Sequence, residues 1–307
     1  LKIKIYNLVI KFFYYYLIIL PIMKIGIIGK GFVGSAVEYG FSCDEKFKAQ
    51  IKIYDTNPIL STHSLSQTVN DSDVVFISVP TPANNDGSIN LESLDIVLKK
   101  ISECIENDCI ILIRSTITPG TSLKFSKKYP SLNIVFNPEF LTEKNANNDF
   151  INQSRIILGG EKKNTSRVAK LYNWRFENKI PIIETNYQTA ELIKYMNNTF
   201  LATKVSFMNE MFLIANKVDA DWSKAVEGFI LDDRVGASHV NVPGHDGKFG
   251  FGGSCFPKDI QALIKFSQNL NIDSKVIQAA WSTNLKVRPE KDWEKLKGRA
   301  IVDKDLD

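Results

Sequence analysis

The stretch 24-KIGIIGKGFVG-34 decides the fold of this chain. It joins a short apolar run to a glycine-rich turn, in which Gly29, Gly31 and Gly34 fit the pattern G-x-G-x-x-G. Between a strand and a helix, the first glycine permits a tight turn and the second lets backbone N–H groups approach a pyrophosphate, while the third lets helix and strand pack closely. The helix N-terminus favours the negative charge of such a group. The stretch therefore predicts a Rossmann-like α/β domain that binds a dinucleotide.

The second predicted strand, Ile51–Tyr54, ends at Asp55, which comes 21 residues after Gly34. At this place an acidic side chain accepts hydrogen bonds from the ribose hydroxyls of a dinucleotide. The carboxylate also repels a 2′-phosphate, so the sequence predicts NAD rather than NADP as the cofactor.

From Met23 onward, short apolar runs alternate with helical stretches, which is typical of a doubly wound parallel sheet. The predicted strands span 24–28, 51–54, 74–79, 110–113, 134–136, 155–158 and 180–183, and later helices span 222–228, 257–270 and 274–285. Residues 189–218 contain neither Pro nor Gly and predict one long helix. We therefore expect an NAD-binding domain at 23–186, an all-helical domain at 187–290 and a C-terminal tail at 291–307.

Composition excludes several classes of protein. The 307 residues are 44% hydrophobic and 23% charged, with a net charge of +4 and no dense block of Lys or Arg, so we expect no nucleic-acid partner. The four cysteines have the spacing neither of zinc ligands nor of a disulfide framework, and the three histidines form no metal-binding motif. No metal is expected.

The first 22 residues do not follow this pattern. Leu1 is not a start methionine, and the apolar run over 5–22 is long enough for a membrane anchor, although Lys11 interrupts it. The first strand begins at about Met23 and needs nothing before it. We expect an upstream extension with the natural start at Met23, and hence a cytoplasmic protein without a membrane segment. A membrane anchor is the alternative.

Five further segments carry specific strings. They are VPTP at 79–82, STITPG at 115–120, NPEFLTE at 137–143, AELIK at 190–194 followed by Asn198, and GFGGSCFPKD at 250–259. With the glycine-rich turn they make the chain, from about residue 23 to 285, resemble the UDP-glucose/GDP-mannose dehydrogenase family. The resemblance implies an NAD-dependent oxidoreductase that converts a nucleotide sugar, first of all UDP-glucose, to a uronic acid by two hydride transfers.

Cys255 lies just before a predicted helix that has Pro257 in its first turn. The N–H groups of a helix N-terminus stabilise a thiolate and lower its pKa, which predicts a nucleophile. Such a thiolate holds the intermediate aldehyde as a thiohemiacetal, and a second oxidation gives a thioester that water cleaves. The alternative is a buried structural cysteine, which fits poorly in a loop with three glycines.

Lys194 and Asn198 lie four residues apart in the long predicted helix and therefore share a face. An ammonium and an amide that point the same way stabilise a developing oxyanion, and a solvated helix face is the alternative. The resemblance implies that both are catalytic. It also implies that Asp259 pairs with Lys194 or a water to move protons, that Thr116 positions this water, and that Glu139 is the general acid or base.

The resemblance implies binding residues as well. For the cofactor they are Gly29, Gly31, Phe32, Val33, Gly34, Asp55, Pro80, Thr81, Thr116 and Glu143. For the substrate they are Glu139, Phe140, Leu141, Lys194, Asn198, Arg234, Phe249, Gly252 and Ser254. Arg234 matches an arginine that reaches the nucleotide sugar of the neighbouring subunit, which implies a homodimer with the long helix at its interface.

The chain departs from the pattern of the family near its end. The resemblance implies a further α/β unit that supplies much of the nucleotide pocket, whereas this sequence stops at Asp307. We expect either a short natural form or a cut reading frame, with the loop 239–248 as a compensating insertion that offers His245 and Lys248 to phosphate. Two other functions stay open. One is a dehydrogenase that takes a single hydride from a hydroxy acid with Cys255 idle, and the other is a non-catalytic NAD-binding protein.

Overall fold

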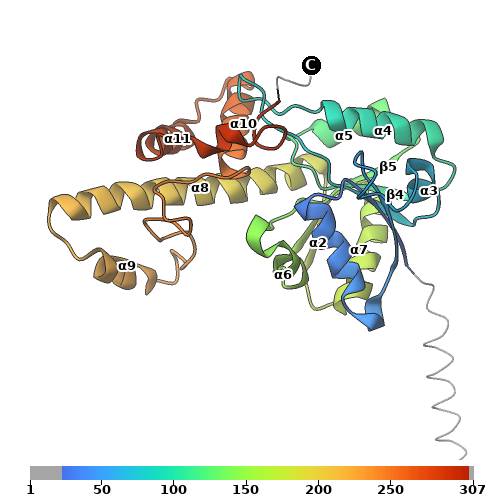
Figure 1. Cartoon of the computed structure of the whole chain (residues 1–307), viewed down its shortest axis with the longest axis horizontal. Coiled ribbons are helices and arrows are strands. Elements are labelled where there is room, and N and C mark those ends of the chain that lie inside the picture. Colours follow the sequence, from blue (N-terminus) through green and yellow to red (C-terminus); the bar gives the residue numbers. More distant parts are fainter. Residues whose placement is uncertain (1–22, 304–307) are drawn as a thin grey trace, which may run out of the picture.

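The computed structural model of the chain describes residues 23–303, so the expectations for residues 1–22 lie outside the described residues. Seven strands form a sheet in the order β2-β1-β3-β4-β5-β6-β7 (Figure 1). They are β1 (Lys24–Ile28), β2 (Gln50–Tyr54), β3 (Val74–Ile77), β4 (Ile110–Ile113), β5 (Asn133–Phe136), β6 (Ile156–Gly160) and β7 (Ile182–Thr185). All seven predicted strands are confirmed.

Helices cover both faces of the sheet, as the prediction of a doubly wound fold requires (Figure 1). One face carries α2 (Phe32–Ser42), α6 (Ala146–Ile151) and α7 (Lys162–Phe176), and the other carries α3 (Leu65–Asn70), α4 (Glu92–Cys104) and α5 (Thr121–Lys128). Short 3-10 turns are η1 (Glu45–Phe47), η2 (Glu143–Asn145) and η3 (Asp292–Lys295). Each face of the sheet thus contributes side chains to a core of its own.

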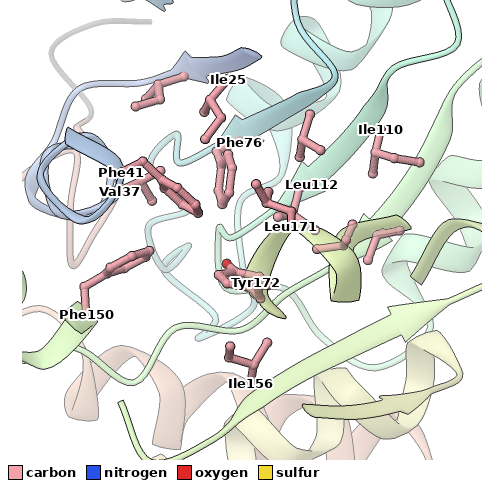
Figure 2. Packing of buried hydrophobic residues seen from close by; sticks show 14 of the residues in the cluster. Ile25, Val37, Phe41, Phe76, Ile110, Leu112, Phe150, Ile156, Leu171 and Tyr172 are labelled. Carbon is pink, nitrogen blue, oxygen red and sulfur yellow. The ribbon is translucent and has the colours of Figure 1, made fainter. Parts of the chain in front are cut away.

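The core beneath α2, α6 and α7 is aromatic at its centre. The ring centre of Phe41 lies 5.7 Å from that of Phe76, 5.8 Å from that of Phe150 and 6.2 Å from that of Tyr172 (Figure 2). Gly40 is required beside these rings, because a Cβ there would lie 2.1 Å from the Phe150 ring. This packing fixes α2, and with it the glycine-rich turn, on the sheet.

One strand departs from the predicted parallel sheet. β6 runs antiparallel to β5, with Phe136 opposite Gly159, whereas the other neighbouring strands are parallel. The connection of residues 137–155 leaves the carboxyl end of β5 and includes α6, which packs against α2 on one face of the sheet. β6 therefore starts beyond the end of β5 and runs back past it.

The long predicted helix is confirmed as α8 (Tyr187–Lys217), which begins two residues after β7. Asn186 caps it, since its side chain accepts a hydrogen bond from the Thr189 N–H at 2.8 Å. Against α8 pack α10 (Phe256–Asn269) and α11 (Lys275–Val287), and near its far end lies α9 (Trp222–Ile230) (Figure 1). Within residues 23–303, none of the helices has the length and apolar character to cross a bilayer.

The segment after α11 returns to the α/β part of the chain. The Ala83 N–H donates to the Ala300 carbonyl at 2.9 Å, and the Ala83 carbonyl accepts from the Val302 N–H at 3.0 Å. Trp293 is buried, with its ring centre 5.2 Å from that of Trp281 in α11. These contacts place the segment beside the loop that follows β3.

Candidate active site

The glycine-rich turn after β1 has the predicted conformation. Gly29 has a φ of +88°, which glycine adopts without strain, and a Cβ on Gly34 would lie 2.1 Å from the Gly29 carbonyl oxygen. A Cβ on Gly31 would meet open space, and Gly31 lines a cavity. The turn thus leaves the N-terminus of α2 open to a ligand, as binding of a pyrophosphate requires.

Asp55 lies at the end of β2 and contacts the same turn. Its Oδ2 accepts a hydrogen bond from the Lys30 N–H at 2.7 Å, and its Oδ1 accepts one from the Asn57 N–H at 2.8 Å. The side chain is partly exposed and does not line the cavity. It lies beside the turn, where the sequence predicts the ribose hydroxyls.

A cavity of about 380 Å³ lies at the carboxyl edge of the sheet, next to the start of α10. The predicted site residues that line it are Gly31, Phe32, Val33, Pro80, Thr81, Thr116, Glu139, Glu143, Ser254 and Cys255. Sequence reasoning missed the remaining lining residues, which are Ser78, Val79, Arg114, Ser115, Lys258 and Arg299. The cavity therefore joins the predicted cofactor residues to the predicted nucleophile.

The two loops after β3 and β4 are tied together in one wall of this cavity. Thr81 Oγ1 donates a hydrogen bond to the Thr116 carbonyl at 2.8 Å, and Ser115 Oγ donates one to the Val79 carbonyl at 2.7 Å. At another place on the wall, Glu143 forms an ion pair with Arg299 at 2.8 Å. The predicted cofactor residues of both loops are thus fixed relative to each other.

A buried ion pair connects α8 to this cavity. Lys194 Nζ donates to Glu139 Oε1 at 2.8 Å and to the Glu139 carbonyl at 2.6 Å, and both side chains are buried. Burial alone would lower the pKa of Lys194, but Glu139, Asp259 and Cys255 together outweigh burial and hold that pKa above its usual value. Lys194 is therefore an ammonium, which donates hydrogen bonds and does not act as a base.

Asp259 is the second buried carboxylate, and the predicted pairing with Lys194 is not formed. Its Oδ1 accepts from Lys258 Nζ at 2.6 Å, and its Oδ2 accepts from Asn198 Nδ2 at 2.6 Å. Lys194 is already bound to Glu139, whereas Lys258 lies in the same first turn of α10 as Asp259. Sequence reasoning missed Lys258 because lysines are rarely buried, although its place between Cys255 and Asp259 was a signal.

Cys255 is the N-cap residue of α10, and Pro257 lies in the first turn of that helix, as predicted. The predicted lowering of its pKa is wrong. Burial raises the pKa of the Cys255 thiol, and the Glu139 carboxylate adds to the rise, while the Lys194 ammonium opposes it. Sγ lies 3.7 Å from Ser254 Oγ, and either atom can donate the hydrogen bond between them. The resting form of Cys255 is a neutral thiol.

The loop that precedes Cys255 packs on α11. Asn284 accepts a hydrogen bond from the Phe251 N–H at 2.7 Å and donates one to the Phe251 carbonyl at 3.0 Å. A Cβ on Gly252 would lie 2.4 Å from Arg288 Nη2. The predicted substrate residue Gly252 therefore faces α11, and its role in the loop is to permit this close contact.

Two other predicted substrate residues surround Glu139 and do not line the cavity. The Leu141 N–H donates to Glu139 Oε2 at 2.8 Å. The Phe140 ring centre lies 5.5 Å from Lys194 Nζ. Phe140 and Leu141 thus support the buried ion pair from one side.

The remaining predicted substrate residues lie in the helical part, away from this cavity. Arg234 forms an ion pair with Asp232 at 2.5 Å and has 88% of its side chain exposed. The Phe249 ring centre lies 5.5 Å from that of Phe212, and Lys248 pairs with Glu290 at 3.3 Å. His245 lines a separate cavity of about 430 Å³ beside α9. Among residues 23–303, no group of three His, Cys, Asp or Glu side chains is arranged to bind a metal.

Comparison with known proteins agrees with this geometry. Residues 45–175 match the NAD binding domain of the UDP-glucose/GDP-mannose dehydrogenase family, and residues 188–286 match its central domain. The UDP-glucose 6-dehydrogenase of Rickettsia bellii is 34% identical in an alignment that covers 92% of this chain and 71% of that protein. The UDP-glucose 6-dehydrogenase of Rickettsia prowazekii is 35% identical over 87% of this chain and 60% of that protein.

A solved structure gives the same result. The UDP-glucose dehydrogenase from Pyrobaculum islandicum has a TM-score of 0.77 and 26% identity, and covers 90% of this chain and 70% of that one. The chain spans 58% and 57% of the length of the corresponding proteins of Rickettsia felis and Rickettsia typhi. The matched NAD binding domain confirms the predicted class of cofactor. The chain therefore belongs to the UDP-glucose/GDP-mannose dehydrogenase family of NAD-dependent oxidoreductases, as its sequence predicts.

Proposed function

We propose that this chain oxidises a nucleotide sugar, first of all UDP-glucose, to the uronic acid, with NAD as oxidant and Cys255 as covalent nucleophile. The observation that carries the proposal is a single cavity lined by Cys255, Glu139 and the N-terminus of α2. This cavity combines a thiol, a buried carboxylate and a turn suited to a pyrophosphate. The relatives named UDP-glucose 6-dehydrogenase support the choice of substrate.

NAD bound in this cavity would accept the hydride in both oxidations. Gly31, Phe32 and Val33 would hold its pyrophosphate at the N-terminus of α2, where a Cβ on residue 31 would occupy the open space. Asp55 would accept hydrogen bonds from the ribose hydroxyls. Thr81 and Thr116 line the same cavity and would form its wall beside the cofactor, on the side of β3 and β4.

Lys194 and Asn198 would act first, on the primary alcohol. As the hydride leaves the carbon, the alcohol oxygen gives up its proton, and the Lys194 ammonium and the Asn198 amide stabilise the charge that develops there. Asp259 is the buried carboxylate bound to Asn198, so it would receive this proton directly or through a water. The product of the first step is an aldehyde.

Cys255 would then trap the aldehyde. Its sulfur bonds to the aldehyde carbon while a carboxylate of the site takes the thiol proton and passes it to the carbonyl oxygen, which gives a thiohemiacetal. Since the resting thiol is neutral, proton removal has to accompany the attack. The hydride on this carbon would pass to a second NAD while the hydroxyl proton passes to a carboxylate of the site, and a thioester on Cys255 results.

Glu139 would act last, in hydrolysis of the thioester. It takes a proton from a water that Thr116 positions, the water oxygen bonds to the acyl carbon, and the carbon–sulfur bond breaks. Cys255 regains its proton, and the uronic acid leaves. The ion pair with Lys194 keeps Glu139 fixed near the sulfur throughout.

We also propose a homodimer that forms through α8. Exposed apolar side chains follow one stripe of this helix and its end, namely Leu192, Met196, Phe200, Phe207, Ile214 and Val218. Spacings of four and seven residues place them on one face, and an exposed apolar stripe of this length is typical of a protein interface. Arg234 lies exposed in the segment that follows α9, and it would reach the nucleotide sugar bound to the partner subunit.

A panel of nucleotide sugars tests this function, with NADH formed counted against sugar consumed. We expect two NADH for each substrate, a uronic acid as product, and UDP-glucose as the best substrate. One NADH for each molecule of a hydroxy acid would indicate a single-hydride dehydrogenase instead. NAD binding without turnover of any sugar would indicate a non-catalytic protein, and either result would contradict the proposal.

A further inference from the structure

Arg114 is a charged group at the cavity that has no step in the proposed reaction. It follows β4 directly, is 3% exposed, and lines the cavity. Nη1 donates to Asn137 Oδ1 at 2.5 Å and to the Tyr172 hydroxyl at 3.1 Å. Both partners are neutral. Asn137 is an amide, and burial raises the pKa of the Tyr172 hydroxyl above its usual value. The buried Nε of Arg114 has no hydrogen-bond partner among the described residues.

The other charges in the wall of the cavity are balanced. The pairs are Glu139 with Lys194 at 2.8 Å, Glu143 with Arg299 at 2.8 Å and Lys258 with Asp259 at 2.6 Å. Arg114 forms no ion pair with any carboxylate in the described part of the chain. A buried charge without a counter-charge is costly, so proteins pair such a group or use it to bind a ligand.

The surroundings of Arg114 place it on the α2 side of the sheet. Its guanidinium carbon lies 5.7 Å from the centre of the Phe150 ring. The rings of Phe150 and Tyr172 both pack against Phe41 of α2 (Figure 2). The first residues of α2 line the same cavity as Arg114, so a helix N-terminus and an unpaired guanidinium face one space.

Ser78 adds a second unpaired donor to this space. It follows β3, the strand between β1 and β4, and it lines the cavity. Its Oγ is buried and has no partner among residues 23–303. Ser78 lies beside the turn, because a Cβ on Gly29 would lie 2.8 Å from its carbonyl oxygen, and Arg114 follows the next strand and lines the same cavity.

We propose that Arg114, with Ser78 and the N-terminus of α2, forms one anion site that binds the pyrophosphate of the dinucleotide. The inference rests on the proposed use of NAD. Arginine suits this group, because its planar donors form charge-assisted hydrogen bonds with phosphate oxygens. The bound pyrophosphate supplies the counter-charge that the protein does not provide.

Binding measurements test this site without turnover. The full chain is titrated with NAD, with ADP-ribose, which keeps the pyrophosphate but lacks nicotinamide, and with adenosine, which has no phosphate. Arg114→Met removes the charge and retains most of the volume. We expect it to weaken NAD and ADP-ribose alike by about 10- to 100-fold, and adenosine by less than about 2-fold.

Arg175→Met is the matched control. Arg175 is a second buried arginine of the α/β part, where it donates to the Gly40 carbonyl, and it does not line the cavity. We expect Arg175→Met to leave the ratios between the affinities for NAD, ADP-ribose and adenosine at their wild-type values. If Arg114→Met is recovered unfolded, Arg114→Gln, which keeps a donor for Asn137 and Tyr172, is titrated in its place with the same expectation.

Two results would overturn the inference and leave the proposed function intact. One is an unchanged affinity for ADP-ribose in the folded variant. The other is an equal loss for adenosine, which would show general damage to the site. A wild-type chain that binds neither NAD nor ADP-ribose would instead contradict the proposed function.

Discussion

The surroundings of Cys255, the proposed nucleophile, favour its neutral thiol. Burial raises the pKa of its thiol, and of the two lysines that oppose this rise, Lys194 has the larger effect. A neutral thiol reacts slowly with oxidants and other electrophiles. In the proposed mechanism, the carboxylate of Glu139 or Asp259 would accept the proton that leaves the thiol when it attacks the aldehyde.

Alkylation of the free protein by iodoacetamide should reveal this raised pKa. The thiolate is the reactive form, so the rate at Cys255 should rise with pH and have its midpoint above about 8.5, the value of an unperturbed cysteine. Lys194→Met removes a cation that lowers this pKa and should move the midpoint further up. The difference between wild type and Cys255→Ser isolates Cys255 from the other thiols, and a midpoint below about 7 would contradict the structure.

Asp55 should determine the choice between NAD and NADP. Asp55→Asn keeps an acceptor for the Lys30 N–H and removes the negative charge. We therefore expect the turn to stay intact and the difference between the affinities for NAD and NADP to become smaller. Asp55→Ala also removes this acceptor and should weaken NAD binding further. Fluorescence titration with both dinucleotides measures the gap. A wild-type preference for NADP would show that Asp55, at the end of the second strand, does not bind the ribose hydroxyls.

Residues whose roles follow from the local backbone could be predicted from the sequence. Gly29 and Gly34 are of this kind, because a tight turn and a close helix contact each require glycine within a few residues. The hydrogen bond between Asn198 and Asp259 could not be predicted, since it depends on how α8 and α10 pack. The sequence gives no sign that Arg114 is buried, because α6 and α7 close over it only in the folded chain.

At the scale of elements, strands and helices follow from local apolar runs and from the places of Gly and Pro. The direction of β6 does not, because a short apolar run carries no information about which way a strand runs. That direction depends on the path that residues 137–155 take from β5 to β6. The same path brings Glu139 to the cavity, so the antiparallel strand and the site share one cause.

The exposed stripe of α8 should control the oligomeric state. Phe200→Asp with Phe207→Asp places two charges in the proposed interface, and we expect a monomer in place of a dimer. Light scattering after size-exclusion chromatography measures the mass. Ile59→Asp is the control, since Ile59 is an apolar residue that is 90% exposed outside α8. A wild-type monomer, or a dimer that survives both charges, would contradict the proposed interface.

At the scale of the whole molecule, the site exists only where three parts of the chain meet. The α/β part contributes the turn and Glu139, α10 contributes Cys255, and the returning segment contributes Arg299. We propose the division into domains at 23–186 and 187–290 because the sheet ends at β7 and α8 begins at Tyr187. The sequence predicts each part separately, whereas the contact of Ala83 with the returning segment depends on the tertiary fold.

The most direct test of covalent catalysis is the yield of NADH from Cys255→Ser with UDP-glucose and NAD. A serine hydroxyl is a far poorer nucleophile near neutral pH, and its ester resists hydrolysis more than a thioester does. We expect the variant to fold, bind NAD and lose acid formation by several orders of magnitude. Glu139→Gln should instead accumulate a thioester on Cys255, which intact-protein mass spectrometry shows as added mass. Two NADH per substrate from Cys255→Ser at nearly the wild-type rate would contradict a covalent role for Cys255.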